Sequence, residues 1–183
     1  MLYIMRHGKT DWNAVHRLQG RTDVPLNDEG RAMARAAALE YKDVHFDVCY
    51  CSPLVRARET AEILLGGRNV PIITDERLVE MCFGEYEGVE NCFEIPDCPI
   101  VTLFKEPQNY TTPVSGAESL DELFARTGEF LREVVQPLLA EGKDVLIVGH
   151  GAMNCAILCQ VKNIPVKDFW KAGIENCKLM RLL

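Results

Sequence analysis

The alternation of short apolar segments with longer helical patterns is the feature that most constrains the fold. Residues 145–148 (VLIV), 2–5 (LYIM) and 46–51 (FDVCYC) are apolar or rich in β-forming residues, so we predict strands there. Strands that alternate with helices favour a layered α/β fold with a mostly parallel sheet. The predicted strands are 2–5, 46–51, 70–74, 145–148 and 178–183, and the predicted helices are 28–41, 53–65, 119–140 and 152–161, with a short one after Pro165.

Residues with strong end preferences mark two of the helix starts. Ser52 and Pro53 have the pattern of an N-cap followed by a first helical residue. Ser119 with Glu122 forms a capping-box pattern. Between residues 82 and 115 the periodicity fails and four prolines occur, so we expect loops with a single helical turn at most.

The size and charge of the chain limit its possible roles. Its 183 residues suit one domain, 1–183, and no repeat or linker is visible. With 20 Lys and Arg against 27 Asp and Glu, the net charge of −7 disfavours nucleic acid and anionic membranes as partners. We see neither a targeting segment nor an apolar run of membrane-spanning length, and therefore expect a cytoplasmic protein. Its eight cysteines show no paired zinc-ligand spacing, and we expect neither disulfides nor a metal site.

Two strands end in the same kind of residues. Residues 2–5 run into Arg6-His7-Gly8, and residues 145–148 run into Gly149-His150-Gly151. Ligands of open α/β sheets collect beyond the carboxyl ends of the strands, so both histidines are expected to face one pocket. The neighbouring glycines would let backbone or ligand approach closely. A single histidine near a strand end is more often structural than catalytic, and the two together carry the inference.

A third element points to the same edge of the sheet. Arg56 lies in the first turn of the helix predicted after residues 46–51. Together with Arg6 and the helix N-terminus, it would form a site for an anion such as phosphate. Arg58, two positions further on, is expected to face solvent, which is also the usual place of a lone arginine.

Six segments, in order along nearly the whole chain, resemble the signature motifs of the histidine phosphatase superfamily, also called the phosphoglycerate mutase-like family. This resemblance implies a three-layer α/β/α sandwich with a mostly parallel central sheet. It also implies a histidine acid phosphatase-type phosphoric monoester hydrolase or a mutase. The segments are 5–13 (MRHGKTDWN), 18–34 (LQGRTDVPLNDEGRAMA), 50–65 (YCSPLVRARETAEILL), 78–88 (LVEMCFGEYEG), 115–123 (SGAESLDEL) and 145–152 (VLIVGHGA).

The resemblance implies a role for each site residue. His7 would be the nucleophile that forms a phosphohistidine, with its other ring nitrogen donating to a backbone carbonyl. Arg6, Arg56 and His150 would hold the phosphoryl oxygens, and Glu80 would be the general acid and then the base. No metal or other cofactor is implied. The resemblance further assigns phosphate or substrate contacts to Asn13, Gln19, Gly20 and Gly151.

Some positions depart from the family pattern or lack a clear role. Lys9 stands where the family commonly has an acidic residue, and residues 91–112 have no clear counterpart. Asn13 could instead be a turn or cap residue. Glu85 and Glu87 are expected to be loop surface. His16 and His45 match no motif.

Three functions remain open, and phosphatase is favoured. A phosphoglycerate mutase needs extra cations for the substrate carboxylate, but Lys105 is the only basic residue between Glu80 and Glu118. A phospholigand-binding member without turnover is the alternative of another class. The favoured function is a metal-independent phosphomonoesterase acting on a small phosphorylated metabolite and releasing inorganic phosphate, as a monomer or homodimer. The aromatic and apolar residues of the loop before Glu118 suggest a leaving group with little charge.

Overall fold

The computed structural model describes residues 1–110, 116–171 and 173–183. Its centre is a five-stranded sheet with the order β3-β2-β4-β1-β5. All neighbouring strands are parallel except β5, which runs antiparallel to β1. The mostly parallel sheet predicted from the sequence is therefore confirmed. The strands are β1 (Leu2–Arg6), β2 (Val48–Cys51), β3 (Ile72–Thr74), β4 (Val145–Gly149) and β5 (Leu179–Arg181).

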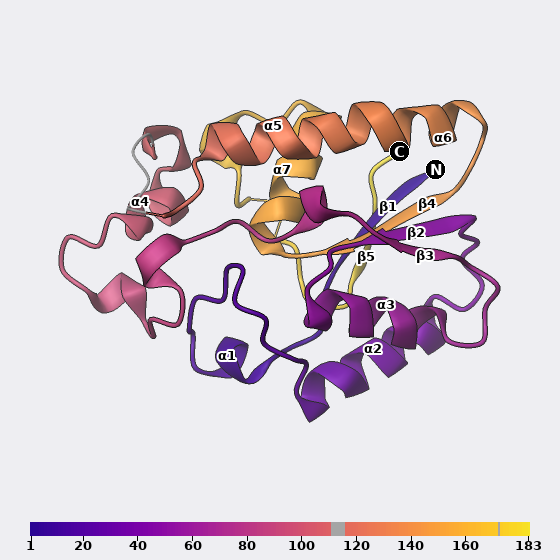
Figure 1. Ribbon diagram of the computed structural model, residues 1–183, viewed down its shortest axis with the longest axis horizontal. Helices are drawn as coiled ribbons and strands as arrows, with labels where there is room; N and C mark the ends of the chain where they lie inside the picture. Colours follow the sequence, from indigo (N-terminus) through magenta and orange to yellow (C-terminus); the bar gives the residue numbers. More distant parts are fainter. Residues whose placement is uncertain (111–115, 172) are drawn as a thin grey trace.

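Helices cover both faces of the sheet, which gives the three layers (Figure 1). Helices α2 (Asp28–Glu40) and α3 (Val55–Leu65) pack against each other on one face. On the other face α5 (Leu120–Phe130), continued by α6 (Gln136–Ala140), packs with α7 (Gly151–Lys162). β4 lies between two neighbours and is buried at every residue, because both its faces are covered.

The helix predicted over 119–140 changes its hydrogen-bond pattern in the middle. A π-helical turn, Leu131–Val135, separates α5 from α6. Pro137 explains it, since proline has no N–H to donate to residue 133 and its ring displaces that carbonyl. The capping box predicted at the start is confirmed: Ser119 Oγ accepts from Glu122 N, and the Glu122 carboxylate accepts from Ser119 N.

The predicted start of α3 is wrong by two residues. The helix begins at Val55, and Ser52 is not its N-cap; Ser52 Oγ accepts a hydrogen bond from Leu54 N in the preceding turn. The carboxylate of Asp23 accepts instead from Val55 N at 2.7 Å. This helix N-terminus is thus already occupied by an anion of the protein itself, which removes it from the predicted phosphate site.

The segment after Glu80 contains more helical structure than its prolines suggested. Helix α4 (Ile100–Lys105) and the 3-10 turns 84–86, 92–94 and 107–109 lie here, at the left in Figure 1. Part of the predicted loop, residues 111–115, lies outside the described residues. Short helix α1 (Asp11–Ala14) and the 3-10 turns 76–78 and 166–168 complete the elements. Within the described ranges no helix has the length and apolar character needed to cross a membrane.

Candidate active site

Strands β1 and β4 bring the two histidines together. Arg6 pairs with Gly149 in the parallel register, and His7 N donates to Gly149 O at 2.9 Å. The strands therefore end side by side, and the rings of His7 and His150 meet edge to face with centroids 5.1 Å apart. The structure places both histidines at one point of the sheet edge, as the two strand endings predicted.

The His7 ring is buried and held in one orientation. Its Nδ1 lies 2.6 Å from Gly8 O, so the nitrogen that carries the proton donates there and Nε2 keeps its lone pair. Burial, together with the positive charges of Arg56 and Arg6, holds the pKa of His7 well below its usual value. The ring is consequently neutral at pH 7.

Three residues outside the predicted site set fix the backbone around His7. Asn176 Nδ2 donates to His7 O at 2.6 Å, and Gly8 N donates to Thr60 Oγ1 at 3.0 Å. Thr60 in turn donates to Arg56 O, so it joins the nucleophile's loop to α3. Gly30 lies so close that a Cβ on Gly8 would stand 2.5 Å from its carbonyl oxygen. The room that Gly8 leaves is therefore filled by the start of α2.

The His150 ring is fully buried, but neither nitrogen has a hydrogen-bond partner among the described residues. Its pKa is also well below the usual value, because of burial and then of the positive charges of Arg56 and Arg6. A neutral imidazole carries one N–H. This N–H lies beside the His7 ring without a partner among the described residues.

Arg56 is fully buried and clamped by the loop that follows Gln19. Its Nη1 donates to Thr22 O at 2.8 Å and its Nη2 to Gly20 O at 2.7 Å, whereas Nε has no partner among the described residues. Burial lowers its pKa to about 10, so it remains cationic at pH 7. Gly20 therefore holds the Arg56 guanidinium through its carbonyl group and also lines the cavity described below.

The expectation that Glu87 is loop surface is wrong. Its carboxylate accepts hydrogen bonds from Arg21 N, from Thr22 N and Oγ1, and from Phe83 N, and so holds the loop that clamps Arg56. Gly20 has a φ of +52°, and a Cβ there would stand 2.1 Å from the Glu87 carboxylate. A long-range carboxylate contact of this kind leaves no local sequence signal. Glu85 is exposed, as expected.

Arg6 and Glu80 meet beside Gly151. A Cβ on Gly151 would lie 3.7 Å from Arg6 Cζ and 3.6 Å from Glu80 Oε2. Arg6 Nη1 donates to Ile174 O at 3.3 Å, and its buried Nε has no partner among the described residues. Glu80 is 8% exposed and accepts from the N–H groups at the start of α7, Ala152 at 3.2 Å and Met153 at 3.0 Å, and from its neighbour Met81 at 2.8 Å.

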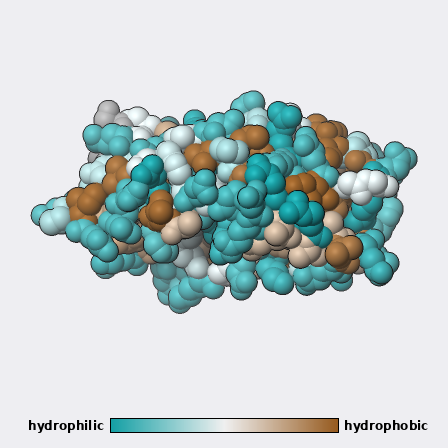
Figure 2. Space-filling view, turned by 90° about the horizontal axis from the view of Figure 1, so that it is seen from below, coloured by the Kyte–Doolittle hydropathy of each residue, from teal (hydrophilic) through white to brown (hydrophobic). Residues whose placement is uncertain are grey.

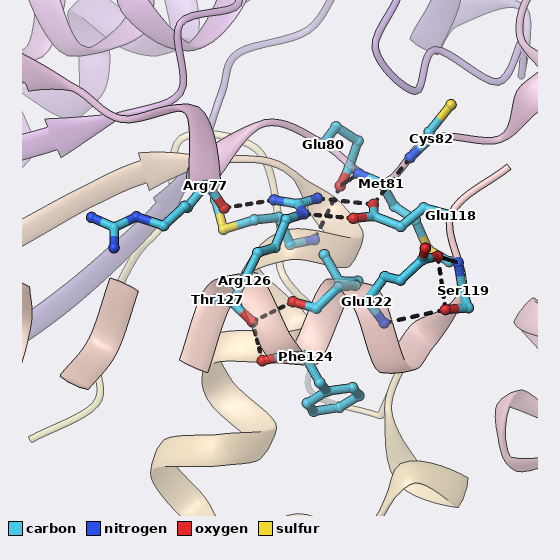
Figure 3. Close-up of polar contacts among 12 residues, drawn as sticks. Arg77, Glu80, Met81, Cys82, Glu118, Ser119, Glu122, Phe124, Arg126 and Thr127 are labelled. Atoms are coloured by element: carbon cyan, nitrogen blue, oxygen red, sulfur yellow. Dashed lines mark hydrogen bonds and ion pairs between the residues drawn. The ribbon is translucent and has the colours of Figure 1, made fainter. Parts of the chain in front are cut away.

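A buried ion pair holds the segment that carries Glu80 (Figure 3). The Glu118 carboxylate accepts from Arg126 Nε at 2.6 Å and Nη2 at 3.0 Å, a two-pronged pair. Arg126 Nη1 also donates to Arg77 O, and Glu118 accepts from Cys82 N. The pair thus binds backbone on both sides of Glu80. The G-E-S resemblance covers Glu118, but nothing in the sequence linked it to Arg126 or to this segment.

The predicted rim residues surround a cavity of about 370 Å³ that also reaches Arg6, His7, Arg56, Glu80 and Gly151. Asn13 forms a capping box with Thr10: its Oδ1 accepts from Thr10 N at 3.1 Å. The cap interpretation is confirmed, and Asn13 also lines the cavity. Gln19 Oε1 accepts from Thr10 Oγ1 at 3.0 Å. Thr10 is thus a buried support of the rim that sequence reasoning missed.

Lys9 and the two unassigned histidines lie away from this cavity or at its edge. Lys9 forms an ion pair with Glu29 at 2.6 Å and lines a neighbouring cavity of about 590 Å³, which shares Arg6, Gly151 and Trp170 with the first. His16 is exposed at the rim, and exposed His45 lies near Asp47.

The site can be compared with known proteins. Residues 2–183 match the histidine phosphatase superfamily (branch 1). The chain belongs to this superfamily. It is 33% identical over 180 residues to a 2,3-bisphosphoglycerate-dependent phosphoglycerate mutase 2 of Gloeobacter violaceus, covering 97% of this chain and 82% of that protein. It is 31% identical over 183 residues to a putative phosphoserine phosphatase 2 of Hydrogenobacter thermophilus, covering 99% and 88%.

The solved structure of Bacillus stearothermophilus YhfR matches the fold with a TM-score of 0.87 and 31% identity, covering 97% of this chain and 88% of that one. The superfamily and the phosphoglycerate mutase-like fold expected from the motifs are therefore confirmed. The relatives carry the names of both mutases and phosphatases, so the family alone does not separate these two activities.

Proposed function

We propose that this member of the superfamily is a phosphomonoesterase that needs no metal and works through a phosphohistidine on His7. The observation that carries the proposal is the buried, neutral His7, whose Nδ1 is bound to Gly8 O beside Arg6, Arg56 and His150. Fixing the proton on Nδ1 leaves the Nε2 lone pair for attack on phosphorus. The two guanidinium groups and the His150 N–H supply the charge and donors that a phosphoryl group in transfer requires.

The reaction takes two displacements. In the first, Nε2 of His7 bonds to phosphorus, the ester P–O bond breaks, and Glu80 gives its proton to the leaving oxygen. In the second, Glu80 takes a proton from water, the water oxygen bonds to phosphorus, and the N–P bond breaks to release inorganic phosphate. The position of Glu80 next to Gly151 and Arg6, at the edge of the same cavity, supports this double role.

A phosphoglycerate mutase is the second candidate, because relatives that cover most of this chain carry that name. The charges of the cavity favour the phosphatase. Among the described residues that line it, the lysine and arginine side chains are Arg6, Arg17 and Arg56, and Arg17 already pairs with Glu90. A substrate carboxylate would be left without a free cation, which is costly in a partly buried site.

The decisive test follows hydrolysis of p-nitrophenyl phosphate with a chelator present, in the wild type and in His7→Ala. We expect turnover and an acid-labile phosphoenzyme in the wild type, and neither in the variant. Loss of wild-type activity on adding chelator would overturn the metal-free mechanism, and retained labelling in His7→Ala would overturn the nucleophile. Interconversion of 2- and 3-phosphoglycerate primed by the bisphosphate, faster than hydrolysis of either, would select the mutase. Binding of phosphate without labelling or turnover would indicate a phospholigand-binding protein.

A further inference from the structure

Four aromatic side chains from two distant segments form one side of the cavity that leads to His7. Phe104 of α4 stacks on Trp170, with ring centroids 4.9 Å apart and 17° between the planes. The ring of Phe93 meets that of Phe104 edge to face, with centroids 5.0 Å apart. The buried ring of Phe83 also lies beside Phe104, with centroids 6.3 Å apart. All four line the cavity. We define these residues as the aromatic wall.

One part of the aromatic wall is hydrogen-bonded to the backbone, and another part is open to solvent. Trp170 Nε1 donates to Leu103 O at 2.7 Å, which fixes the indole against the backbone of α4. Phe93 is 51% exposed, whereas His7 is 2% exposed. The wall therefore lines the path from solvent to the nucleophile. Hydrophobic side chains are also visible at the left end of Figure 2, the end at which Figure 1 places α4 and its loops.

The other side of this path is also apolar and aromatic. Trp12 of α1 and Leu18 line the same cavity. The Arg17 guanidinium lies over the Trp12 ring, 5.2 Å from its centroid, and is neutralised by Glu90. With Arg6 and Arg56 set around the phosphoryl position, the path offers flat apolar surfaces to the rest of the ester and no unpaired cation among the described lining residues.

On the basis of the function proposed above, we propose that the substrates are phosphate monoesters whose leaving group carries a flat aromatic ring close to the phosphate. Phe93, Phe104 and Trp170 form the subsite that selects them. Aromatic rings attract each other in edge-to-face and offset-stacked pairs beyond the effect of buried area, and the aromatic wall presents such edges and faces to the cavity. An acidic leaving group would lose its hydration without gaining a partner cation.

The test compares benzyl phosphate with cyclohexylmethyl phosphate, two esters of primary alcohols that are alike in size and differ in the aromatic ring. We expect kcat/KM to be roughly tenfold higher for benzyl phosphate, mainly through KM, as one or two aromatic contacts allow. Phosphoserine and 3-phosphoglycerate should be poorer than both. A ratio of one between the two neutral esters, or a preference for the carboxylated ones, would overturn the proposal.

Variants locate the subsite. Phe93→Leu keeps an apolar side chain at a half-exposed position and should lower the benzyl preference roughly threefold, and Phe93→Leu with Phe104→Leu should abolish it. Ile95→Ala, 39% exposed in the same segment and outside the cavity lining, is the matched control and should keep the preference. A full preference in the double variant, with its fold verified by near-UV circular dichroism, would contradict the subsite.

Binding separates this proposal from the one on which it rests. Calorimetry with benzylphosphonate and cyclohexylmethylphosphonate needs no turnover, because the P–C bond is not hydrolysed. Tighter binding of benzylphosphonate by the wild type, lost in the double variant, supports the subsite even if no ester is hydrolysed, in which case the phosphatase function alone fails. Equal binding of the two phosphonates together with normal hydrolysis would overturn the subsite and leave the phosphatase function standing.

Discussion

The two histidines at the ends of β1 and β4 occupy equivalent places and are supported in opposite ways. His7 is fixed through its ring by Gly8 O and through its backbone by Gly149 and Asn176. The His150 ring makes no hydrogen bond within the described residues. A nucleophile must keep its lone pair aimed before the substrate arrives, whereas a donor to the phosphoryl group finds its partner only when the substrate is bound. The difference in support thus fits the two roles proposed for these histidines.

Replacing each histidine by alanine should show the difference between the two most clearly. We expect His7→Ala to lose at least ~10⁴-fold in turnover of p-nitrophenyl phosphate and all phosphoenzyme, since the bond to phosphorus cannot form. His150→Ala should lose about 10²- to 10³-fold, the usual effect of removing one transition-state donor, yet still form phosphoenzyme. Rapid-quench labelling measures both. Equal loss of labelling in the two variants would show that the roles do not differ in this way.

The positioning of Glu80 next to Gly151 can be tested through the ion pair between Glu118 and Arg126, which binds the segment on both sides of Glu80. Arg126→Lys removes one of the two hydrogen bonds to Glu118 and should make the position of the segment that carries Glu80 less fixed. We expect kcat for benzyl phosphate to fall roughly tenfold, because its leaving oxygen needs a proton, and kcat for p-nitrophenyl phosphate to change little, because nitrophenolate needs none. The exposed Arg132→Lys is the control on the same helical run. An equal loss with both esters would indicate a purely structural pair.

The acid side of the pH profile should sharpen the assignment of His7. Because burial and two arginines lower the pKa of His7 below 6.5, the ring keeps its lone pair as the pH falls through 6.5. We therefore expect kcat/KM to begin to fall only below pH 6.5, where protonation of the His7 ring removes the nucleophilic lone pair. The free energy of unfolding should depend on pH in the same direction. Because the pKa values of both histidines are lowered in the folded protein, the unfolded chain binds their protons more readily. Folding stability is therefore highest above the unfolded pKa of histidine and decreases as the pH falls below it. An acid limb at or above pH 6.5 would contradict a depressed pKa.

How far the sequence could predict the site differs between its parts. Strand endings are local patterns, so His7, His150, Arg6 and the edge at which they meet could be inferred from short windows and the topology of parallel strands. The supporting residues could not be inferred in this way. Thr60 binds Gly8 over 52 residues of chain, Asn176 binds His7 over 169 and Glu87 binds Thr22 over 65, and each would pass as an ordinary polar residue. Asp23 at the start of α3 belongs to the same class, and it overturned the prediction of a free helix N-terminus there.

The aromatic wall was the least predictable region for a different reason. The aromatic residues near residue 100 suggested a weakly charged leaving group, but Trp170 lies on a segment that no motif singled out. Its stacking on Phe104 depends on how the segment that carries Trp170 packs against α4. Side-chain packing between irregular segments leaves no periodicity that a sequence window could detect.

The smallest effect is expected from the most remote support of His7. Asn176→Ala removes the donor to His7 O at 2.6 Å but leaves the ring bond to Gly8 O and the strand pairing intact. One net hydrogen bond contributes about 1 kcal/mol, so we expect kcat for p-nitrophenyl phosphate to fall roughly fivefold. KM should hardly change, because no phosphate donor is lost. Asn69→Ala, at an exposed position after α3, is the control. A rise in KM with kcat unchanged would mean that Asn176 contacts the substrate and does not position His7.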